Sequence, residues 1–518
     1  MRQKPLTRYR AARPLSLWLA VVVAALSGLV NAAAFPGLGW WPLVFVGTGL
    51  MLWSLIGRRV WASLLVGYVG GFAFFGSHIL WITVYLGPVP WLALVGLESI
   101  FFALGAALIA LAWRFVPRLW PGIAGRLLGL PVVLAGLWVL REGVSSVWPY
   151  GGFSWGRLAF SQSDSTFAPL VAWLGISGLS FALAWLSAVL LQSIREISVA
   201  WTVRGITALA AFLLAAAVPA WPVISSGSIR VAAVQGNSDS GLFAQYQPGQ
   251  TLDDHLQATV PLIGQRVDVV VWPENASDLD PLRYQQAAET LDYVTKAMKA
   301  PLVTGTITED SKGRRFNSML LWENGKGAVD QYDKIHPVPF AEYLPDRTFW
   351  YPLAPSLFDL VPRDYSFGQR NNVFDINGAV AGLAICFDIV DDALIRQMID
   401  GGAEYILAPT NNADFGHTDE SQQQVAIARL RAIETGRSVV NASTVGVSAM
   451  FAPDGRVIAQ LQPFSPGALV ERIPLSTTMT PAILAGRAIE WLVSGLGIVG
   501  LVLGLLLRPR KKRVVPRG

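Results

Sequence analysis

Charged residues are scarce in this sequence, at 14% of its 518 positions against 53% hydrophobic residues. A soluble globular domain carries about 25% charged residues, so one large soluble domain is excluded. Intrinsic disorder is excluded as well, because disordered chains are poor in apolar residues. The chain has 49 Gly and 32 Pro but no glycine at every third position, so it is not collagen-like.

Cysteine is almost absent. The single Cys386 excludes an intramolecular disulfide and a cysteine-rich metal site. The histidines lack the spacing of a zinc-protease motif, and no glycine-rich phosphate-binding loop occurs. These histidines are His78, His255, His336 and His417. We therefore expect no metal ion and no cofactor.

Acidic residues are rare outside one segment. Residues 229–480 carry 30 of the 35 acidic residues and 19 of the 40 basic ones, which gives this segment a formal net charge of −11 and the rest +16. The overall charge of +5 is therefore the sum of two unlike parts. Consequently, the basic pI of about 9.3 is no reason to expect nucleic-acid binding.

Long hydrophobic stretches fill most of the remaining chain. A helix needs about 20 apolar residues to cross a bilayer, and we predict transmembrane helices at roughly 15–34, 40–57, 61–84, 91–113, 124–141, 166–192, 201–221 and 484–507. The chain thus divides into a membrane domain at 1–228, a separate domain at 229–480, and an eighth helix with a basic tail at 481–518. The first stretch has a basic start and small residues at Ala32–Ala34, so a cleavable signal peptide is the alternative interpretation.

Basic residues alternate between the loops and predict the orientation. They lie at Arg2, Lys4, Arg8, Arg10 and Arg13, at Arg58 and Arg59, at Arg114, Arg118 and Arg126, at Arg195 and Arg204, and in the tail from Arg508 to Arg517. The loops after the first and third stretches contain no Lys or Arg. Because cytoplasmic loops are enriched in these residues, we predict cytoplasmic termini and an extracytoplasmic segment 229–480.

Few ionisable residues fall inside the predicted spans, and His78 and Glu98 stand out among them. An intramembrane carboxylate is a candidate functional group, and a role in helix packing is an equally open interpretation. The spans lack the paired acidic residues of a proton-coupled transporter.

Residues 229–480 change to a pattern typical of an α/β domain. Short apolar runs predict buried strands at 229–234, 268–272, 301–306, 318–322, 379–386 and 405–408, with further strands near 438–451. Helices are predicted at 284–300 and 421–435. Such alternation favours strands that are covered by helices.

Three polar residues follow or end predicted elements of this domain. Cys386 ends an apolar run, and Glu274 follows a buried strand directly after Pro273, which cannot continue the ladder. Lys334 lies in a run rich in proline and aromatic residues at 332–345. Singly, an inert buried thiol, a surface carboxylate and a surface amine are the ordinary interpretations. Together, a Glu, a Lys and a Cys, each in its own motif, indicate a catalytic set.

These motifs resemble the carbon–nitrogen hydrolase (nitrilase) superfamily, whose triad is Glu, Lys and Cys. Placed before the last span of a multi-span chain, such a domain resembles the apolipoprotein N-acyltransferase family. The matching segments are Val234–Asn237, Trp272–Glu274, Lys334–Pro345, Arg431–Arg437 and the aromatic, glycine-rich loop Trp148–Trp155. The resemblance implies a polytopic α-helical membrane domain with an extracytoplasmic αββα sandwich.

The resemblance also implies the reaction and its partners. An acyl chain passes from a phospholipid, through a thioester on Cys386, to the α-amine of a diacylglyceryl-modified apolipoprotein. Glu274 acts as general base, and Lys334 stabilises the oxyanion with a backbone N–H near Phe387. Glu342 hydrogen-bonds Lys334 or orients Glu274, with a structural salt bridge as the alternative. The implied location is the bacterial plasma membrane, and we expect a monomer that binds membrane lipid and no nucleic acid.

Aromatic residues of the glycine-rich loop are the candidate lipid contacts. Trp148, Tyr150 and Trp155 are expected to line the lipid entry, or to form an ordinary interfacial belt of aromatic residues.

The sequence departs from the family pattern at three places. Phe387-Asp388 stands where the family most often has Tyr-Glu, residues 411–416 lose an aromatic residue, and residues 238–245 lack a family tryptophan. Two other functions stay open: a membrane-anchored nitrilase-type amidase that uses water as acceptor, and a transporter with an inactive sensor domain.

Overall fold

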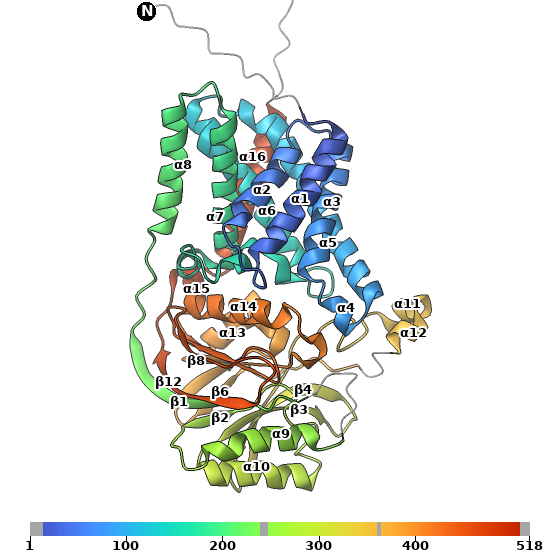
Figure 1. Ribbon diagram of the computed structural model, residues 1–518, viewed down its shortest axis with the longest axis vertical. Helices are drawn as coiled ribbons and strands as arrows, with labels where there is room; N and C mark the ends of the chain where they lie inside the picture. Colours follow the sequence, from blue (N-terminus) through green and yellow to red (C-terminus); the bar gives the residue numbers. More distant parts are fainter. Residues whose placement is uncertain (1–13, 239–246, 360–363, 508–518) are drawn as a thin grey trace, which may run out of the picture.

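The computed structural model describes residues 14–238, 247–359 and 364–507. It consists of a helix bundle joined to an α/β sandwich, one below the other in Figure 1. The basic ends with Arg2–Arg13 and Arg508–Arg517, and almost all of the departing segment 238–245, lie outside the described residues.

The bundle contains most of the predicted spans. Its helices are α1 (Leu17–Ala34), α2 (Leu43–Ser54), α3 (Val60–His78), α5 (Pro88–Phe115), α6 (Leu130–Ser145), α7 (Leu170–Arg195), α8 (Trp201–Ala216) and α16 (Ala488–Leu506), with the short α4 (Ile82–Tyr85) beside α5. Within the described residues, six helices are long and apolar enough to cross a membrane, namely α1, α3, α5, α6, α7 and α16. The chain is therefore a multi-pass membrane protein. The shorter α2 and α8 occupy the other two predicted stretches, and their crossing stays a prediction.

Two sheets of six strands each form the sandwich. The first has the order β12-β1-β2-β3-β4-β5 and the second β11-β10-β9-β8-β7-β6. The strands are β1 (Ser225–Gln235), β2 (Val269–Val271), β3 (Leu302–Glu309), β4 (Arg315–Glu323), β5 (Gly327–Asp333), β6 (Val373–Ile376), β7 (Ala379–Leu383), β8 (Tyr405–Thr410), β9 (Ser438–Ser443), β10 (Ala449–Phe451), β11 (Val457–Gln460) and β12 (Gly467–Ser476). Parallel pairs lie at the centre of each sheet, β1-β2-β3 and β7-β8-β9, and antiparallel strands flank them.

Helices cover the outer faces of both sheets. The covering helices are α9 (Gln250–Thr259), α10 (Gln285–Met298), α13 (Asp392–Asp400) and α14 (Glu420–Thr435). The short α11 (Arg347–Trp350) and α12 (Pro355–Phe358) lie to the side of the sandwich, and α15 (Pro481–Ala485) packs on α7 and α14. Leu291 and Val294 of α10 pack with Trp322 on the outer face of the first sheet. Val271 and Leu407 meet in the core between the sheets. The order helix, sheet, sheet, helix confirms the predicted αββα sandwich.

The sandwich and the bundle share one hydrophobic core. Ile395 of α13 and Leu430 of α14 belong to the same buried cluster as Leu158 and Leu183 of the membrane part. Figure 1 shows α13 and α14 between the second sheet and the ends of the membrane helices. One face of the catalytic unit is therefore built against the membrane domain.

Each predicted strand of the α/β segment has a counterpart: 229–234 in β1, 268–272 in β2, 301–306 in β3, 318–322 in β4, 379–386 in β7, 405–408 in β8, and those near 438–451 in β9 and β10. One prediction at the site differs: β7 ends at Leu383, and Cys386 begins a short 3-10 helix, Cys386–Val390. The apolar run continues past the strand because Ala384 and Ile385 are themselves fully buried.

Close contact between α6 and α16 depends on two glycines. A Cβ atom at Gly136 would collide with the backbone of Val493, and one at Gly497 would lie 2.6 Å from the Leu137 nitrogen. We predict that Gly136→Leu lowers the thermal unfolding temperature in detergent, because overpacking costs about 1–3 kcal/mol. The control is Gly495→Leu, where a Cβ meets no atom within 4 Å. Equal melting temperatures for the two variants would contradict this packing.

Candidate active site

Glu274 lies three residues beyond the carboxyl end of β2, a central strand of the first sheet. The preceding Trp272 is fully buried, and its indole N–H donates to Thr259 Oγ1 at 3.0 Å. Glu274 itself is 4% exposed. Its Oε1 accepts from Asn317 Nδ2 at 2.7 Å and its Oε2 from the Asn411 backbone N–H at 2.8 Å. Two donors therefore hold a buried carboxylate in one orientation.

Lys334 is the first residue after β5 and is 1% exposed. Its backbone N–H donates to the Asn317 carbonyl at 2.8 Å. Its Nζ lies 2.9 Å from Glu342 Oε2, which also accepts from the Val338 backbone N–H at 2.6 Å. A buried ammonium is tolerated only when it is paired, so Glu342 is the group that permits a charged lysine here.

Cys386 lies at the start of a tight turn and is partly accessible. Its φ of +51° is in the left-handed region that non-glycine residues rarely adopt. Asp388 closes the turn, because its Oδ2 accepts from the Ile385 backbone N–H at 3.1 Å and from the Tyr332 hydroxyl at 3.0 Å. A strained backbone held in this way is common where a reactive side chain must be presented.

The three groups act on one another electrostatically. Burial lowers the pKa of the Lys334 ammonium, but the charges of Glu342 and Glu274 outweigh burial and raise it above its ordinary value. Burial raises the pKa of the Cys386 thiol well above its ordinary value; Glu274 adds to this effect and Lys334 opposes it. Burial also raises the pKa of Glu274, against the opposing charge of Lys334. Acid, amine and thiol therefore lie in one site, with the thiol protonated at rest.

Asn317 is a site residue that the sequence analysis missed. Its Nδ2 donates to Glu274 Oε1 at 2.7 Å and to Glu342 Oε1 at 2.8 Å. Glu342 thus pairs with Lys334 directly and reaches Glu274 through this amide. A buried amide within the apolar strand β4 is the signal that could have revealed Asn317, which is 2% exposed.

The residue after the nucleophile candidate packs between aromatic rings of the membrane domain. Phe387 stacks on Trp155, with 5.8 Å between ring centroids and 5° between planes, and on Phe153 at 6.0 Å. The Trp155 indole donates to Gln423 Oε1 at 2.6 Å. The glycine-rich loop of the membrane domain therefore reaches the turn of Cys386.

The three aromatic residues expected at the lipid entry have different surroundings. Trp155 is 2% exposed, whereas Trp148 is 62% and Tyr150 37% exposed. The Tyr150 hydroxyl donates to Asp346 Oδ2 at 2.7 Å. Only Trp148 and Tyr150 are open to the surroundings, and Trp155 forms part of the wall behind Phe387.

His78 and Glu98, the two ionisable residues singled out in the predicted spans, are both buried. His78 stacks on Phe74, and its Nε2 lies 3.5 Å from the Trp155 carbonyl. Glu98 lies beside Arg141. Within the described residues, no group of three or more His, Cys, Asp and Glu side chains could hold a metal ion.

Comparisons with known proteins agree with this architecture. Residues 230–480 match the carbon-nitrogen hydrolase family, and residues 27–189 match the apolipoprotein N-acyltransferase N-terminal domain. The fold and the site thus define a carbon–nitrogen hydrolase unit attached to a membrane domain.

Relatives along the whole chain identify the family. A protein of Mycolicibacterium smegmatis named apolipoprotein N-acyltransferase is 33% identical over 92% of this chain and 84% of its own. One from Photobacterium profundum with the same name is 26% identical over 95% of both chains. The chain belongs to the apolipoprotein N-acyltransferase family, as its motifs predicted. A solved amidase from Nesterenkonia sp. is 18% identical, covers 52% of this chain and 97% of its own, and has a TM-score of 0.39.

A second buried carboxyl, Glu420 at the start of α14, was not predicted. It is 2% exposed, and its Oε2 accepts from Asn412 Nδ2 at 2.7 Å. Burial raises its pKa from the ordinary 4.5 to about 8; the Asn412 bond opposes this and the Glu274 charge adds to it. The folded state therefore favours the neutral carboxyl.

This carboxyl makes stability depend on pH. Because the folded pKa is raised, its contribution is complete below about pH 4.5 and is lost as the pH rises to about 8. The loss is at most about 1.4 kcal/mol per pH unit. We predict that Glu420→Gln, which is always neutral, flattens the fall in stability measured by denaturant unfolding between pH 5 and 8. Substitution of the exposed Glu471 by Gln should leave the slope unchanged, and a wild-type slope in Glu420→Gln would contradict the assignment.

Proposed function

We propose that this chain transfers an acyl chain from a membrane phospholipid to the α-amine of a diacylglyceryl-modified apolipoprotein, with Glu274, Lys334 and Cys386 as the catalytic residues. The observation that carries the proposal is the convergence of these side chains in a sandwich that shares a core with a membrane-helix bundle. The relatives named apolipoprotein N-acyltransferase agree with it. In this proposal the membrane domain is 1–228 and the catalytic domain is 229–480. The last helix and the tail make up 481–518.

In the first half of the reaction, Glu274 takes the proton of the Cys386 thiol. The thiolate attacks the ester carbonyl of the phospholipid, and Lys334 stabilises the oxyanion together with a backbone N–H near Phe387. The ester C–O bond then breaks, Glu274 returns the proton to the departing lysophospholipid oxygen, and the acyl chain remains as a thioester. A base is needed because burial raises the pKa of the Cys386 thiol.

In the second half, the apolipoprotein amine attacks the thioester carbonyl. Glu274 takes a proton from the amine, the C–S bond breaks, and the Cys386 thiol is regenerated while the amide forms. An ester is exchanged for an amide, so the transfer requires no ATP. Glu342 keeps Lys334 charged and, through Asn317, keeps Glu274 oriented during both steps.

The proposed orientation has the catalytic domain outside the cytoplasm of a bacterial plasma membrane, with both termini inside. Basic residues support it. Because α8 runs from its start down to β1, its start lies at the bundle end away from the sandwich. Arg204 near that start donates to the Ser193 carbonyl at the end of α7, Arg126 before α6 pairs with Glu196 just after α7 at 2.9 Å, and Arg58 between α2 and α3 donates to the Leu15 carbonyl before α1. At the other end, Trp81 donates to Gln423 of α14.

Lipid would reach the site beside Trp148 and Tyr150, the exposed aromatic residues of the glycine-rich loop. Both rings suit the interface between water and acyl chains. The buried Trp155 and the partly buried Phe387 would form the apolar wall along which the acyl chain lies. We propose a monomer, because each catalytic residue comes from one chain.

The function is tested in cells. Mass spectrometry of a lipoprotein N-terminus should show an N-acylated cysteine when the gene for this chain is present and a free α-amine when it is deleted. An identical N-terminus in both strains would contradict the proposal.

The thioester is tested with purified protein and a labelled phospholipid. We predict a hydroxylamine-sensitive acyl adduct on Cys386, detected by mass spectrometry, and none in Cys386→Ala. Adding a diacylglyceryl peptide with a free amine should move the label to the peptide. An acyl adduct on Cys386→Ala would exclude the thioester. Release of the acyl chain from the wild-type protein as free fatty acid would indicate a hydrolase that uses water.

The base is tested by Glu274→Gln. We predict that both adduct formation and transfer to the peptide slow by about 10²–10⁴-fold, the usual effect of removing a general base. Glu289→Gln, at an exposed position on α10, is the matched control and should retain the wild-type rate. Normal adduct formation in Glu274→Gln would assign the first step to another base.

A further inference from the structure

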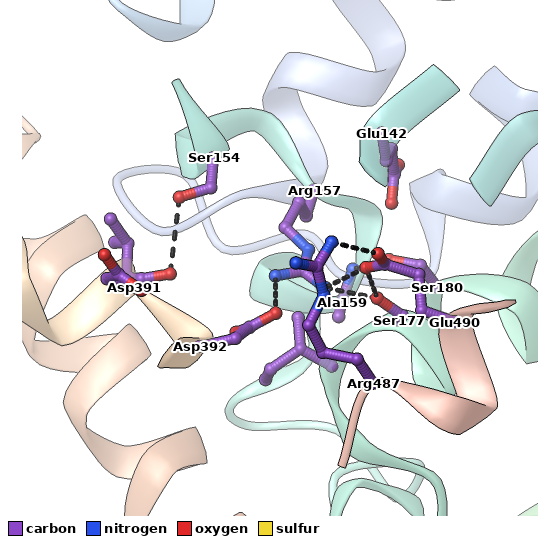
Figure 2. A network of polar contacts seen from close by, with 12 residues as sticks. Glu142, Ser154, Arg157, Ala159, Ser177, Ser180, Asp391, Asp392, Arg487 and Glu490 are labelled. Carbon is purple, nitrogen blue, oxygen red and sulfur yellow. Dashed lines mark hydrogen bonds and ion pairs between the residues drawn. The ribbon is translucent and has the colours of Figure 1, made fainter. Parts of the chain in front are cut away.

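An ionic cluster formed by buried arginines and the partly exposed Asp392 lies where the sandwich meets the membrane helices (Figure 2). Arg157, from the loop between α6 and α7, is 3% exposed. Its guanidinium pairs with Asp392 Oδ2 at 2.7 Å, donates to Ser177 Oγ, and lies 3.9 Å from Glu490 of α16. One arginine therefore connects the start of α13 in the sandwich to two membrane helices.

Arg431 of α14 approaches the same aspartate from the sandwich side. It is 1% exposed, and its Nη2 pairs with Asp392 Oδ1 at 2.7 Å. The same guanidinium donates to the carbonyls of Ile389 at 2.8 Å and Val390 at 3.0 Å. These carbonyls end the turn Cys386–Val390, so the cluster holds the turn that carries the thiol.

The membrane domain contacts this turn a second time. Ser154 Oγ, from the glycine-rich loop, donates to the Val390 carbonyl at 3.3 Å. Glu434 completes the cluster: it pairs with Arg431, and its Oε1 accepts from the Ile176 backbone N–H at 3.2 Å. That donor is free for Glu434 because α7 is interrupted at Gly175, where φ is +67°.

The cluster is an unusual way to join two domains. Removing charges from water costs much free energy, which is recovered only when geometry is good and every charge is paired. The shared hydrophobic core already joins the domains without this cost. The ionic contact differs in that it fixes direction: each guanidinium N–H must meet its own acceptor. Such a contact defines the position of the turn, including the strained Cys386 backbone.

We propose that Arg157, Asp392 and Arg431 are positioning residues that fix the turn of Cys386 to the membrane helices, so that alignment of the thiol depends on the bundle. The inference rests on the proposed function, in which Cys386 is the nucleophile. It adds that the membrane domain is part of the active-site framework, in addition to holding the sandwich at the bilayer.

The test compares two ways of cutting the junction in the full-length protein. Asp392→Asn removes the charge that both arginines share. The matched control is Arg429→Gln, which also cuts a contact between α14 and the membrane part, its ion pair with Asp164, but leaves the turn untouched. Three quantities are measured: the melting temperature, kcat and KM for acylation by labelled phospholipid, and the pH profile of Cys386 alkylation by iodoacetamide. Cys386 is the only cysteine, so alkylation reports on this thiol alone.

For Asp392→Asn we expect kcat to fall about 10- to 100-fold, as for a small misplacement of a reacting group, with KM changed less than about threefold. The alkylation profile should shift along the pH axis. Arg429→Gln should have the wild-type kcat and the wild-type alkylation profile. Wild-type kcat and an unshifted profile in folded Asp392→Asn would overturn the proposal.

A conservative variant covers the case in which Asp392→Asn does not fold. Arg431→Lys keeps the charge but cannot reach both turn carbonyls and both carboxylates. It should show the same fall in kcat and the same shift of the profile, and wild-type values there would overturn the proposal. Full transfer activity in Cys386→Ala would instead refute the assignment of Cys386 as nucleophile. The alkylation profiles of Asp392→Asn and Arg431→Lys, which retain Cys386, would still decide whether the cluster positions the turn.

Discussion

The site depends on one constraint, the need to keep an ammonium charged in a place from which water is excluded. Lys334 is 1% exposed, and an unpaired buried charge would lose its proton or unfold the region. Glu342 supplies the pairing charge, and the Val338 N–H and Asn317 amide hold that carboxylate. Glu274 shares the same amide. The orientation of Glu274 therefore follows from the pairing of Lys334 with Glu342, because both carboxylates accept from the same Asn317 amide.

A second consequence concerns the lipid. The turn of Cys386 lies on the side of the second sheet that faces the bundle, where Phe387 stacks on rings of the membrane domain. A soluble hydrolase could bring its substrate in through water. In the proposed reaction, the acyl chain would meet the rings of Trp155 and Phe387 beside the thiol, and contact with these apolar rings would lower the cost of exposing the chain to water.

Much of this arrangement follows from local sequence patterns. Apolar runs predicted the long membrane helices and the central strands, because lipid contact in the former and burial on both faces in the latter leave few polar residues in them. Motifs predicted Glu274, Lys334 and Cys386, since each directly follows or ends a recognisable run. Contacts between distant segments were beyond reach: nothing near Asn317 in the chain indicates that its amide meets Glu274 and Glu342, and nothing near Arg157 indicates a partner at Asp392.

The first and last strands of the sandwich have a consequence for its modularity. β1 and β12 pair in antiparallel fashion, with Ser225 opposite Ser476, so the chain enters and leaves the first sheet at the same corner. An element with adjacent ends can be spliced between two neighbouring helices without pulling them apart. A free-standing enzyme of this shape would thus need only two short connectors to become resident in a bilayer, one from α8 and one to α16 through α15.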